Sequence, residues 1–274
     1  MHSKEDVLSK EGIISWLNKP EKFNILVEKS LTSTNTILKE LAAKHYPEGT
    51  VLIAEEQTAG RGRRGRSFYS PGKYGVYFSV LLKMGEKVEE PTLITAAAAV
   101  AAVHAIKDVL GVSVGIKWVN DLYLDGKKVC GILTESVLNG ERVETVILGV
   151  GINVTAPESG YPDEIADIAT AVVAPGNLLK KVNHENGLVR CRLIAATLEH
   201  FWDFYKNINA LEFLQVYKER SILIGHEVLV KQNNEEKRAF VLDIDNLCRL
   251  VVRYENGDVT ALNSGEVRAS LREL

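Results

Sequence analysis

Two tight-turn signals, Asp125-Gly126 and Asn139-Gly140, lie between apolar segments and constrain the fold more than any other feature of the sequence. Asp-Gly and Asn-Gly favour the two-residue turns that join neighbouring antiparallel strands, because both turn positions need a positive backbone φ angle. The apolar segments on either side run over residues 114–124, 129–138 and 143–154. We therefore predict a three-stranded antiparallel meander, which excludes a doubly wound parallel sheet.

The rest of the first 222 residues mixes short apolar runs with segments of helical spacing. The short runs predict strands at residues 23–27, 51–54 and 76–82, and the helical spacing predicts helices at residues 37–44, 91–110, 188–206 and 210–220. Ser33, Thr34 and Asn35 precede the first of these helices and have side chains suited to capping its start. The fold class is therefore α+β, with a mixed, largely antiparallel sheet and flanking helices.

The composition of the chain changes after Ile222. Short strand-like segments then alternate with turn residues, at residues 226–231, 239–244, 247–254 and 259–262 and around Val267. Five short strands in so small a region predict a small β-barrel. We place a domain boundary near Leu223, which divides the chain into residues 1–222 and 223–274.

Charge and cysteine content limit the classes of function. The formal net charge is −3, whereas a domain that binds nucleic acid through its overall charge is usually basic. Any basic site must therefore be local. The three cysteines, Cys130, Cys191 and Cys248, are odd in number and sparse, which argues against a disulfide framework. They include no C-x-x-C pair, which argues against a structural zinc site.

Targeting and membrane signals are weak. Charged residues interrupt residues 1–20, so we expect no signal peptide. The most apolar stretch, residues 93–106, is too short to span a bilayer and is followed by Lys107 and Asp108. We expect a cytoplasmic protein with reduced thiols and no membrane association.

A glycine- and arginine-rich loop is the most distinctive chemical feature. Four arginines and three glycines occur within the seven residues Gly60–Arg66. Glycines allow backbone N–H groups to approach an anion, and arginines bind phosphate or carboxylate with two hydrogen bonds. The G-K-[ST] ending of a P-loop is missing. The loop is therefore either a different kind of anion site or an exposed basic segment that touches nucleic acid.

A second motif is Lys117-Trp118-Val119-Asn120-Asp121. Its aspartate could bind Mg²⁺ and its lysine a polyphosphate. The alternative is a surface ion pair of little energetic value, with Trp118 in the core.

Glycines within predicted strands form a third feature. Gly131 follows Lys128, and Gly149 and Gly151 precede Asn153. A glycine inside a strand indicates close approach by a ligand or by another backbone, or else a bulge. Lys128 either points toward the same place or is simply solvated, and the amide of Asn153 could pair with an adenine edge.

Taken together, these motifs resemble those of the biotin protein ligases. The family's segments correspond here to Ser33-Thr34-Asn35, Gly60–Arg66, Lys117–Asp121, Lys128-Val129-Cys130-Gly131 and Gly149-Val150-Gly151-Ile152-Asn153, in the same order. The resemblance covers residues 23–155, and it implies a class II synthetase-like catalytic domain followed by an SH3-like barrel. Val119 replaces the family's usual proline, Cys130 its alanine and Phe68 its common tryptophan, and none of these changes removes a charged or polar group.

The resemblance also implies a role for individual residues. The implied biotin-binding residues are Ser33, Thr34, Asn35, Gln57, Arg61, Gly62, Arg63, Lys128 and Gly131. The implied ATP-binding residues are Arg61, Arg63, Phe68, Lys117, Asn120 and Asn153. Catalytic roles fall to Arg63, Lys128 and Asp121, and Asp121 is also the candidate ligand for Mg²⁺.

The activity that the resemblance implies is an ATP- and Mg²⁺-dependent ligase reaction. Biotin is adenylated to biotinyl-5′-AMP and transferred to one lysine of a biotin carboxyl carrier protein, in acetyl-CoA carboxylase or a related carboxylase. A homodimer is implied as well.

Three alternatives stay open: a lipoate or octanoate ligase, a nucleic-acid-binding module, and a ligase that also acts as a repressor. A helix-turn-helix needs two or more helices and a turn, and only residues 1–22 precede the first predicted strand. We therefore expect no DNA binding.

Overall fold

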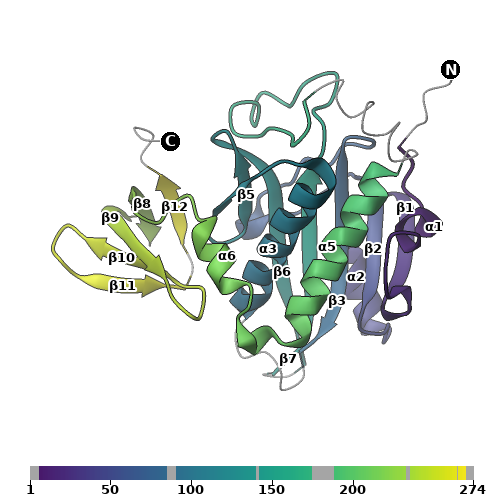
Figure 1. Cartoon of the computed structure of the whole chain (residues 1–274), viewed down its shortest axis with the longest axis horizontal. Coiled ribbons are helices and arrows are strands. Elements are labelled where there is room, and N and C mark those ends of the chain that lie inside the picture. The colour runs from purple at the N-terminus through teal and green to yellow at the C-terminus, as the bar shows by residue number, and fades with distance from the viewer. Residues whose placement is uncertain are drawn as a thin grey trace.

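The larger part of the protein is built around a seven-stranded sheet (Figure 1). The computed structural model describes residues 6–84, 91–139, 142–174, 188–232, 235–263 and 265–269. The strand order of the sheet is β1-β2-β3-β7-β6-β5-β4. The strands are β1 (Asn24–Leu31), β2 (Thr50–Gln57), β3 (Gly75–Lys83), β4 (Gly115–Lys117), β5 (Asp121–Leu124), β6 (Lys127–Asn139) and β7 (Arg142–Asn153). Only β1 and β2 pair in parallel, and the other described pairs are antiparallel. The predicted mixed, largely antiparallel sheet is confirmed.

The predicted meander is also confirmed, because β5, β6 and β7 are neighbours in chain order. Asp125 and Gly126 both have positive φ angles in the β5–β6 turn, as a type I′ hairpin turn requires. At the β6–β7 turn, Asn139 pairs with Arg142, and Gly140 lies outside the described residues.

The prediction of one strand over residues 114–124 is wrong. The segment forms two antiparallel strands, β4 and β5, with Lys117 opposite Asp121, and the Trp118–Val119 peptide bond in the turn between them is cis. Trp118 and Val119 are buried although they lie in this turn, so an apolar run that resembles one strand contains a turn.

Two layers of helices cover the sheet. Helices α3 (Pro91–Leu110) and α5 (Val189–Lys206) lie side by side on one face, and α2 (Thr34–Ala43) lies on the other (Figure 1). Strand side chains alternate accordingly: Ile53 and Phe78 belong to the core beneath α3 and α5, and Leu52 belongs to the smaller core beneath α2. By length and composition α3 could cross a membrane, but 83% of its apolar stretch is buried inside the protein, as in a core helix.

The start of α2 differs from the capping prediction. Ser33 is the N-cap residue, but its side chain makes no capping hydrogen bond, and the helix begins at Thr34 rather than at residue 37. The backbone N–H of Thr34 donates to Gln57 Oε1 instead. The polar side chains at this helix start therefore serve contacts outside the helix.

The remaining helical segments are short. Among the described residues they are α1 (Lys10–Ile14), α6 (Leu214–Glu219) and three 3₁₀ turns at Pro20–Lys22, Arg63–Gly65 and Ile208–Ala210. The helix predicted at residues 210–220 is thus shorter than expected. Leu211 takes a left-handed conformation at its predicted start, which is incompatible with a continuous right-handed helix.

A five-stranded antiparallel sheet follows α6, in the order β11-β10-β9-β8-β12 (Figure 1). The strands are β8 (Glu227–Gln232), β9 (Glu235–Ile244), β10 (Leu250–Tyr254), β11 (Val259–Leu262) and β12 (Glu266–Ala269). The five predicted strands are confirmed. The SH3-like assignment stays a prediction, as does the boundary near Leu223, which falls between α6 and β8.

A buried arginine ties the N-terminal segment to the main sheet. Arg190 on α5 is 1% exposed. Its guanidinium group pairs with Asp6 at 3.3 Å and with Glu55, at the end of β2, at 2.6 Å. It also donates to the carbonyl oxygen of Gly75 at the start of β3. Three separate segments therefore share this one cation.

Removing this cation should destabilise the whole fold. We expect Arg190→Ala to lower the free energy of unfolding by about 3 kcal/mol, because it leaves the carboxylates of Asp6 and Glu55 without their buried partner. Urea denaturation measures the change. The control is Arg238→Ala on the exposed face of β9, which should stay within about 0.5 kcal/mol of wild type. A loss below about 1 kcal/mol for Arg190→Ala would contradict a supporting role for the cluster.

Candidate functional site

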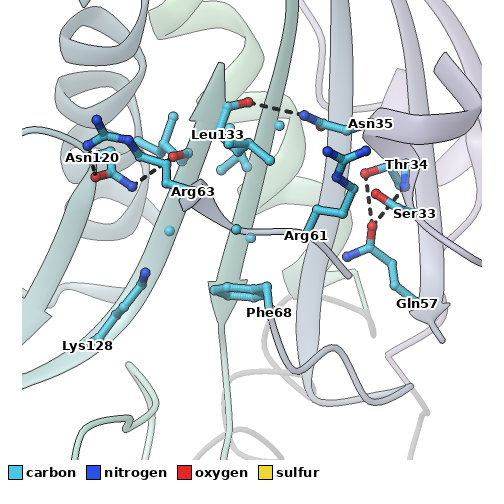
Figure 2. Close-up of a pocket in the computed structure, with 16 residues that line it drawn as sticks. Ser33, Thr34, Asn35, Gln57, Arg61, Arg63, Phe68, Asn120, Lys128 and Leu133 are labelled. Carbon is cyan, nitrogen blue, oxygen red and sulfur yellow. Dashed lines mark hydrogen bonds between the residues drawn. The ribbon is translucent and has the colours of Figure 1, made fainter. Parts of the chain in front are cut away.

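A pocket lies on the face of the sheet that carries α2, away from α3 and α5 (Figure 2). The start of α2, the glycine- and arginine-rich loop and the middles of β6 and β7 enclose it. The lining residues are Ser33, Thr34, Asn35, Gln57, Arg61, Gly62, Arg63, Phe68, Asn120, Lys128, Gly131, Ile132, Leu133, Gly149, Val150 and Gly151. Eleven of these are among the predicted site residues, so sequence motifs far apart in the chain meet at one place.

The two ends of the pocket differ in chemistry. Figure 2 shows Ser33, Thr34, Asn35 and Gln57 grouped at one end, with Arg61 beside them, and Arg63, Asn120 and Lys128 at the other, with the Phe68 ring between. One end therefore offers mainly neutral hydrogen-bonding groups, and the other offers cations.

A hydrogen-bond chain fixes the neutral end. Gln57 Oε1 accepts from the backbone N–H of Thr34 at 2.8 Å and lies 3.1 Å from its hydroxyl oxygen. Gln57 Nε2 donates to Ser70 Oγ. Ser79 Oγ on β3 lies 2.7 Å from Thr34 Oγ1 and 2.5 Å from Asn35 Oδ1. Because these groups hold one another, their donors and acceptors are oriented in advance for a polar ring.

A carboxylate that the sequence analysis missed stands beside this chain. Glu135 on β6 receives hydrogen bonds from Asn35 at 2.8 Å and from Lys39 at 2.6 Å, and Arg61 Nη2 lies 3.2 Å away. Burial alone would raise the pKa of Glu135. The hydrogen bonds from Lys39 and Asn35 and the charges of Lys39 and Arg61 outweigh burial, and the pKa is lowered. Glu135 is therefore an anion that holds Asn35 and Arg61.

The strand glycines make room for side chains. A Cβ atom on Gly149 would lie 2.2 Å from Asn35 Oδ1, and one on Gly151 would lie 2.6 Å from the Phe68 ring. Gly131 faces the same ring and the Lys128 ammonium group. Close approach is found at all three glycines, but the groups that approach are side chains of this chain rather than the predicted ligand or backbone.

The cationic end is built on the turn before β5. Arg63 Nη1 donates to Asn120 Oδ1 at 3.0 Å. Lys128 Nζ pairs with Asp121 Oδ1 at 2.7 Å and lies 5.8 Å from the centre of the Phe68 ring. Burial, and then the charge of Arg64, lowers the pKa of Arg63, but arginine stays charged at neutral pH. Arg63 and Lys128 both line this end of the pocket, and Asp121 is the carboxylate that pairs with Lys128, so the two cations carry more charge than this carboxylate balances, as an anion site requires.

Three predicted site residues do not line the pocket. Asp121 does not reach the pocket itself but forms an ion pair with Lys128, which does line it. Lys117 lies with its ammonium group 5.0 Å from the centre of the Tyr123 ring. Asn153 is buried and donates to the carbonyl oxygen of Thr170. The amide of Asn153 is thus partly committed within the protein.

The residues that the sequence analysis missed follow a strand period. Leu133 and Glu135 are two and four residues beyond Gly131, so they share its face of β6. That alternation could have identified them once Gly131 was assigned to the pocket. Ile132 and Val150 also line the pocket, although their side chains belong to the core under α3 and α5.

The acidic residues near the pocket could supply only part of a binding site for Mg²⁺. Among the described residues no cluster of three or more histidine, cysteine, aspartate or glutamate side chains could hold a metal ion. Asp121 is a single carboxylate, and one of its oxygens is shared between Lys128 and Asn120. Mg²⁺ in phosphate chemistry is often held by one or two carboxylates together with substrate phosphates. Asp121 fits that pattern but could not hold the ion alone.

The fold and the pocket together define a class of protein. A family model described as the Biotin/lipoate A/B protein ligase family matches residues 27–153. The match includes every residue that lines the pocket. The class is therefore that of the biotin and lipoate protein ligases.

Comparison with individual relatives narrows the class from biotin and lipoate protein ligases to biotin protein ligases. The biotin–[acetyl-CoA-carboxylase] ligase of Mycobacterium tuberculosis is 31% identical over 242 residues, which cover 86% of this chain and 85% of that protein. The solved structure of the biotin protein ligase from Aquifex aeolicus in complex with biotin and ATP has a TM-score of 0.71 and 25% identity, over 90% of this chain and 99% of that one. The chain belongs to the biotin protein ligase family.

A further relative is only partly covered. The bifunctional ligase/repressor BirA of Bacillus subtilis is 41% identical over 149 residues, which is 54% of this chain. The matched region spans 46% of the length of that relative.

The tight contact at Gly149 gives a test of the pocket geometry. Gly149→Ala would place a methyl group on the Asn35 amide, so Asn35 must move away from Ser79 and Glu135. We expect a loss of about 1–3 kcal/mol in the free energy of unfolding, as for other overpacked sites. Thermal or urea denaturation measures the loss.

Gly265→Ala is the matched control, because nothing lies within 4 Å of a Cβ atom there and its φ angle is not in the positive range. It should unfold like wild type. Equal stability of both variants would show that Asn35 does not occupy the space over Gly149.

Proposed function

We propose that this protein is a biotin–[biotin carboxyl-carrier protein] ligase. It adenylates biotin with ATP and then transfers biotin to one lysine of an acceptor protein. The observation that carries the proposal is the two-ended pocket, in which hydrogen-bonding groups and paired cations lie on either side of Phe68. Biotin itself has two such ends, a polar ureido ring and a carboxylate.

The neutral end of the pocket is the proposed binding site for the biotin ring. Ser33, Thr34, Asn35 and Gln57 offer hydroxyl and amide groups that can both donate to and accept from a ureido group. Glu135 supports this end through Asn35. Gly131 belongs to the site because a side chain there would fill the space between Lys128 and Phe68.

The cationic end is the proposed site of the carboxylate and the phosphates. Arg63 and Lys128 hold the biotin carboxylate and the α-phosphate, and Arg61 and Gly62 complete the loop over them. Arg61 is paired with Glu135 in this structure, so this role requires it to turn toward the ligand. Asn120 supports Arg63 through their hydrogen bond.

The remaining nucleotide contacts lie around this end. Phe68 offers a flat ring for adenine to stack on, Lys117 is the proposed polyphosphate contact, and Asn153 is the proposed adenine contact. Asn153 already donates one hydrogen bond to Thr170, so its amide has one N–H and its oxygen left for a base edge.

The chemistry follows from where the charges lie. A biotin carboxylate oxygen attacks the α-phosphorus of ATP, the bond to the bridging oxygen breaks, and pyrophosphate leaves with the electron pair. Negative charge accumulates at the α-phosphate, and Arg63 and Lys128 stabilise it there. Mg²⁺, held by substrate phosphates and by Asp121, would neutralise part of the triphosphate charge.

The second step consumes the mixed anhydride. The neutral amine of the acceptor lysine attacks the carbonyl carbon, the carbon–oxygen bond to AMP breaks, AMP leaves, and the amine loses a proton. Asp121 is the proposed group that orients this amine. Phe68 and the loop beside it shield the anhydride from water.

The proposed partner is a biotin carboxyl carrier protein, of acetyl-CoA carboxylase or a related carboxylase, and the proposed location is the cytoplasm. We also propose a homodimer. Strand β1 is an edge of the large sheet, and an unpaired edge can accept a second copy. The opposite edge, β4, already exchanges backbone hydrogen bonds with residues 220–222.

Binding of nucleic acid is the alternative from a different class. Arg61 pairs with Glu135 and Arg63 donates to Asn120, and both line the pocket, which favours a role there. For these reasons we propose no DNA-binding role for the loop.

The first test is formation of the acyl-adenylate. Purified protein is incubated with Mg²⁺, radiolabelled ATP and either biotin, lipoate or octanoate. We expect biotinyl-AMP with biotin alone. Arg63→Ala and Lys128→Ala should each slow its formation by about a hundredfold, because each removes a charge that stabilises the transition state.

Arg64→Ala is the control, since Arg64 is an exposed arginine in the same loop and should keep wild-type rates. Adenylate formed only with lipoate or octanoate would keep the reaction and change the substrate. A folded protein that forms no adenylate with any of the three acids would exclude the ligase proposal.

A further inference from the structure

The turn between β4 and β5 is held by groups that belong to neither strand. The indole N–H of Trp118 donates at 2.8 Å to the carbonyl oxygen of Cys248, in the connection between β9 and β10 of the C-terminal sheet. The carbonyl oxygen of Val119 accepts from the Tyr217 hydroxyl of α6 at 2.8 Å. Tyr217 and Cys248 are 0% exposed, so no water competes for these hydrogen bonds.

The next residue of the turn, Asn120, is fixed in orientation. Its side-chain N–H groups donate to the carbonyl oxygen of Ile132 at 3.0 Å and to Asp121 Oδ1 at 2.9 Å. Both N–H donors are therefore used, and the side-chain oxygen is left to face Arg63, from which it accepts. The position of Arg63 thus depends on the position of this turn.

The chain between α6 and β8 reinforces the attachment. The backbone N–H of Ile116 on β4 donates to the carbonyl oxygen of Arg220 at 2.7 Å, and its own carbonyl oxygen accepts from Ile222 at 3.0 Å. Gly115 allows this approach, since a Cβ atom there would lie 2.4 Å from Ile222 Cγ2. The C-terminal sheet and the cationic end of the pocket are thus joined through a short, well-bonded path.

We propose that Tyr217 and Trp118 are positioning residues for the adenylation step. They fix the turn so that Asn120 holds Arg63 over the pocket, and the C-terminal sheet takes part through the carbonyl of Cys248. Neither residue lines the pocket, so each acts through Asn120. The proposal rests on the proposed ligase function for its kinetic part only.

The test compares two tyrosine variants. Tyr217→Phe removes one hydroxyl group and leaves the buried carbonyl of Val119 without its donor. Tyr205→Phe is the matched control: Tyr205 is also buried, and its hydroxyl oxygen lies 2.7 Å from Glu48 Oε1 and 3.0 Å from the carbonyl oxygen of Lys83, away from the turn. Trp118→Phe removes the indole N–H and keeps an aromatic side chain, as a second variant in case Tyr217→Phe folds poorly.

The first readout needs no activity. The loop is closed by the N–H of Gly62, which donates to Arg66, and by the N–H of Phe68, which donates to Gly60. We expect Tyr217→Phe and Trp118→Phe to speed hydrogen exchange at these two amides, because Arg63 loses its anchor. Tyr205→Phe should leave them at the wild-type rate.

The second readout is kinetic. We expect Tyr217→Phe to lower kcat/KM for ATP by about tenfold, the size of one unsatisfied buried acceptor, with little change in KM for biotin. In an Asn120→Ala background the further loss should shrink to under about twofold, because residues that act through one another are not additive.

Three results would overturn the proposal: variants that match Tyr205→Phe in exchange and in kinetics, equal losses for ATP and biotin, or full additivity with Asn120→Ala. If wild type forms no adenylate but Tyr217→Phe still loosens the loop, the ligase function and the kinetic part of the proposal fail, and only the positioning of Arg63 stands. Without faster exchange in either variant, the positioning role fails whatever the activity.

Discussion

The hydrogen-bonded register between β6 and β7 is the constraint on which the site depends. It places Gly131 opposite Gly151 and Leu133 opposite Gly149, so three glycines meet on the face that carries α2. Asn35 and Phe68 enter the space that these glycines leave. A slip of β7 by one residue against β6 would turn Gly149 and Gly151 toward α3 and α5 and put the side chain of Val150 on the pocket face. The same pairing thus builds a close-packed core on one face and a pocket on the other.

Two further attachments complete the pocket from outside this pair of strands. At the neutral end, β3 supplies Ser79, and Gln57 at the end of β2 holds the first residue of α2. At the cationic end, the turn before β5 supplies Asn120 as the anchor of Arg63. The glycine- and arginine-rich loop lies between the two ends. At the cationic end, Arg63 and Lys128 are already held by Asn120 and Asp121 before a ligand binds. Positive charge that is oriented in advance stabilises a developing anion without further rearrangement.

Local signals in the sequence predicted most of the fold. The Asp125-Gly126 turn and the apolar segments around it were enough for the β5–β6–β7 meander, because hairpin geometry is set by the turn residues themselves. The segment 114–124 was predicted wrongly, because its turn is held by Cys248 and Tyr217, which are far away in the chain. No local pattern reports such contacts.

The candidate site likewise contains features that local sequence signals predict and features that only contacts between distant segments determine. Glycines in strands indicated that something approaches closely, but only the structure identifies Phe68 and Asn35 as the groups that do so. Glu135 was missed because a single glutamate in a strand resembles a solvent-facing residue, and only its register with Gly131 places it on the pocket face. Lys117 and Asn153 were selected by motif, and both have partners away from the pocket lining. Sequence motifs thus identify residues that lie close together in the fold, and packing determines which of their side chains face the pocket.

In the proposed reaction one pocket holds biotin and ATP end to end, with Phe68 between the hydrogen-bonding and the cationic groups. The most direct measurement is a crystal structure of the protein with biotin and a non-hydrolysable ATP analogue. We expect the ureido ring to lie against Ser33, Thr34, Asn35 and Gln57, and the biotin carboxylate to lie beside the α-phosphate between Arg63 and Lys128. A ureido ring at the cationic end, or either ligand bound away from this pocket, would contradict the proposal.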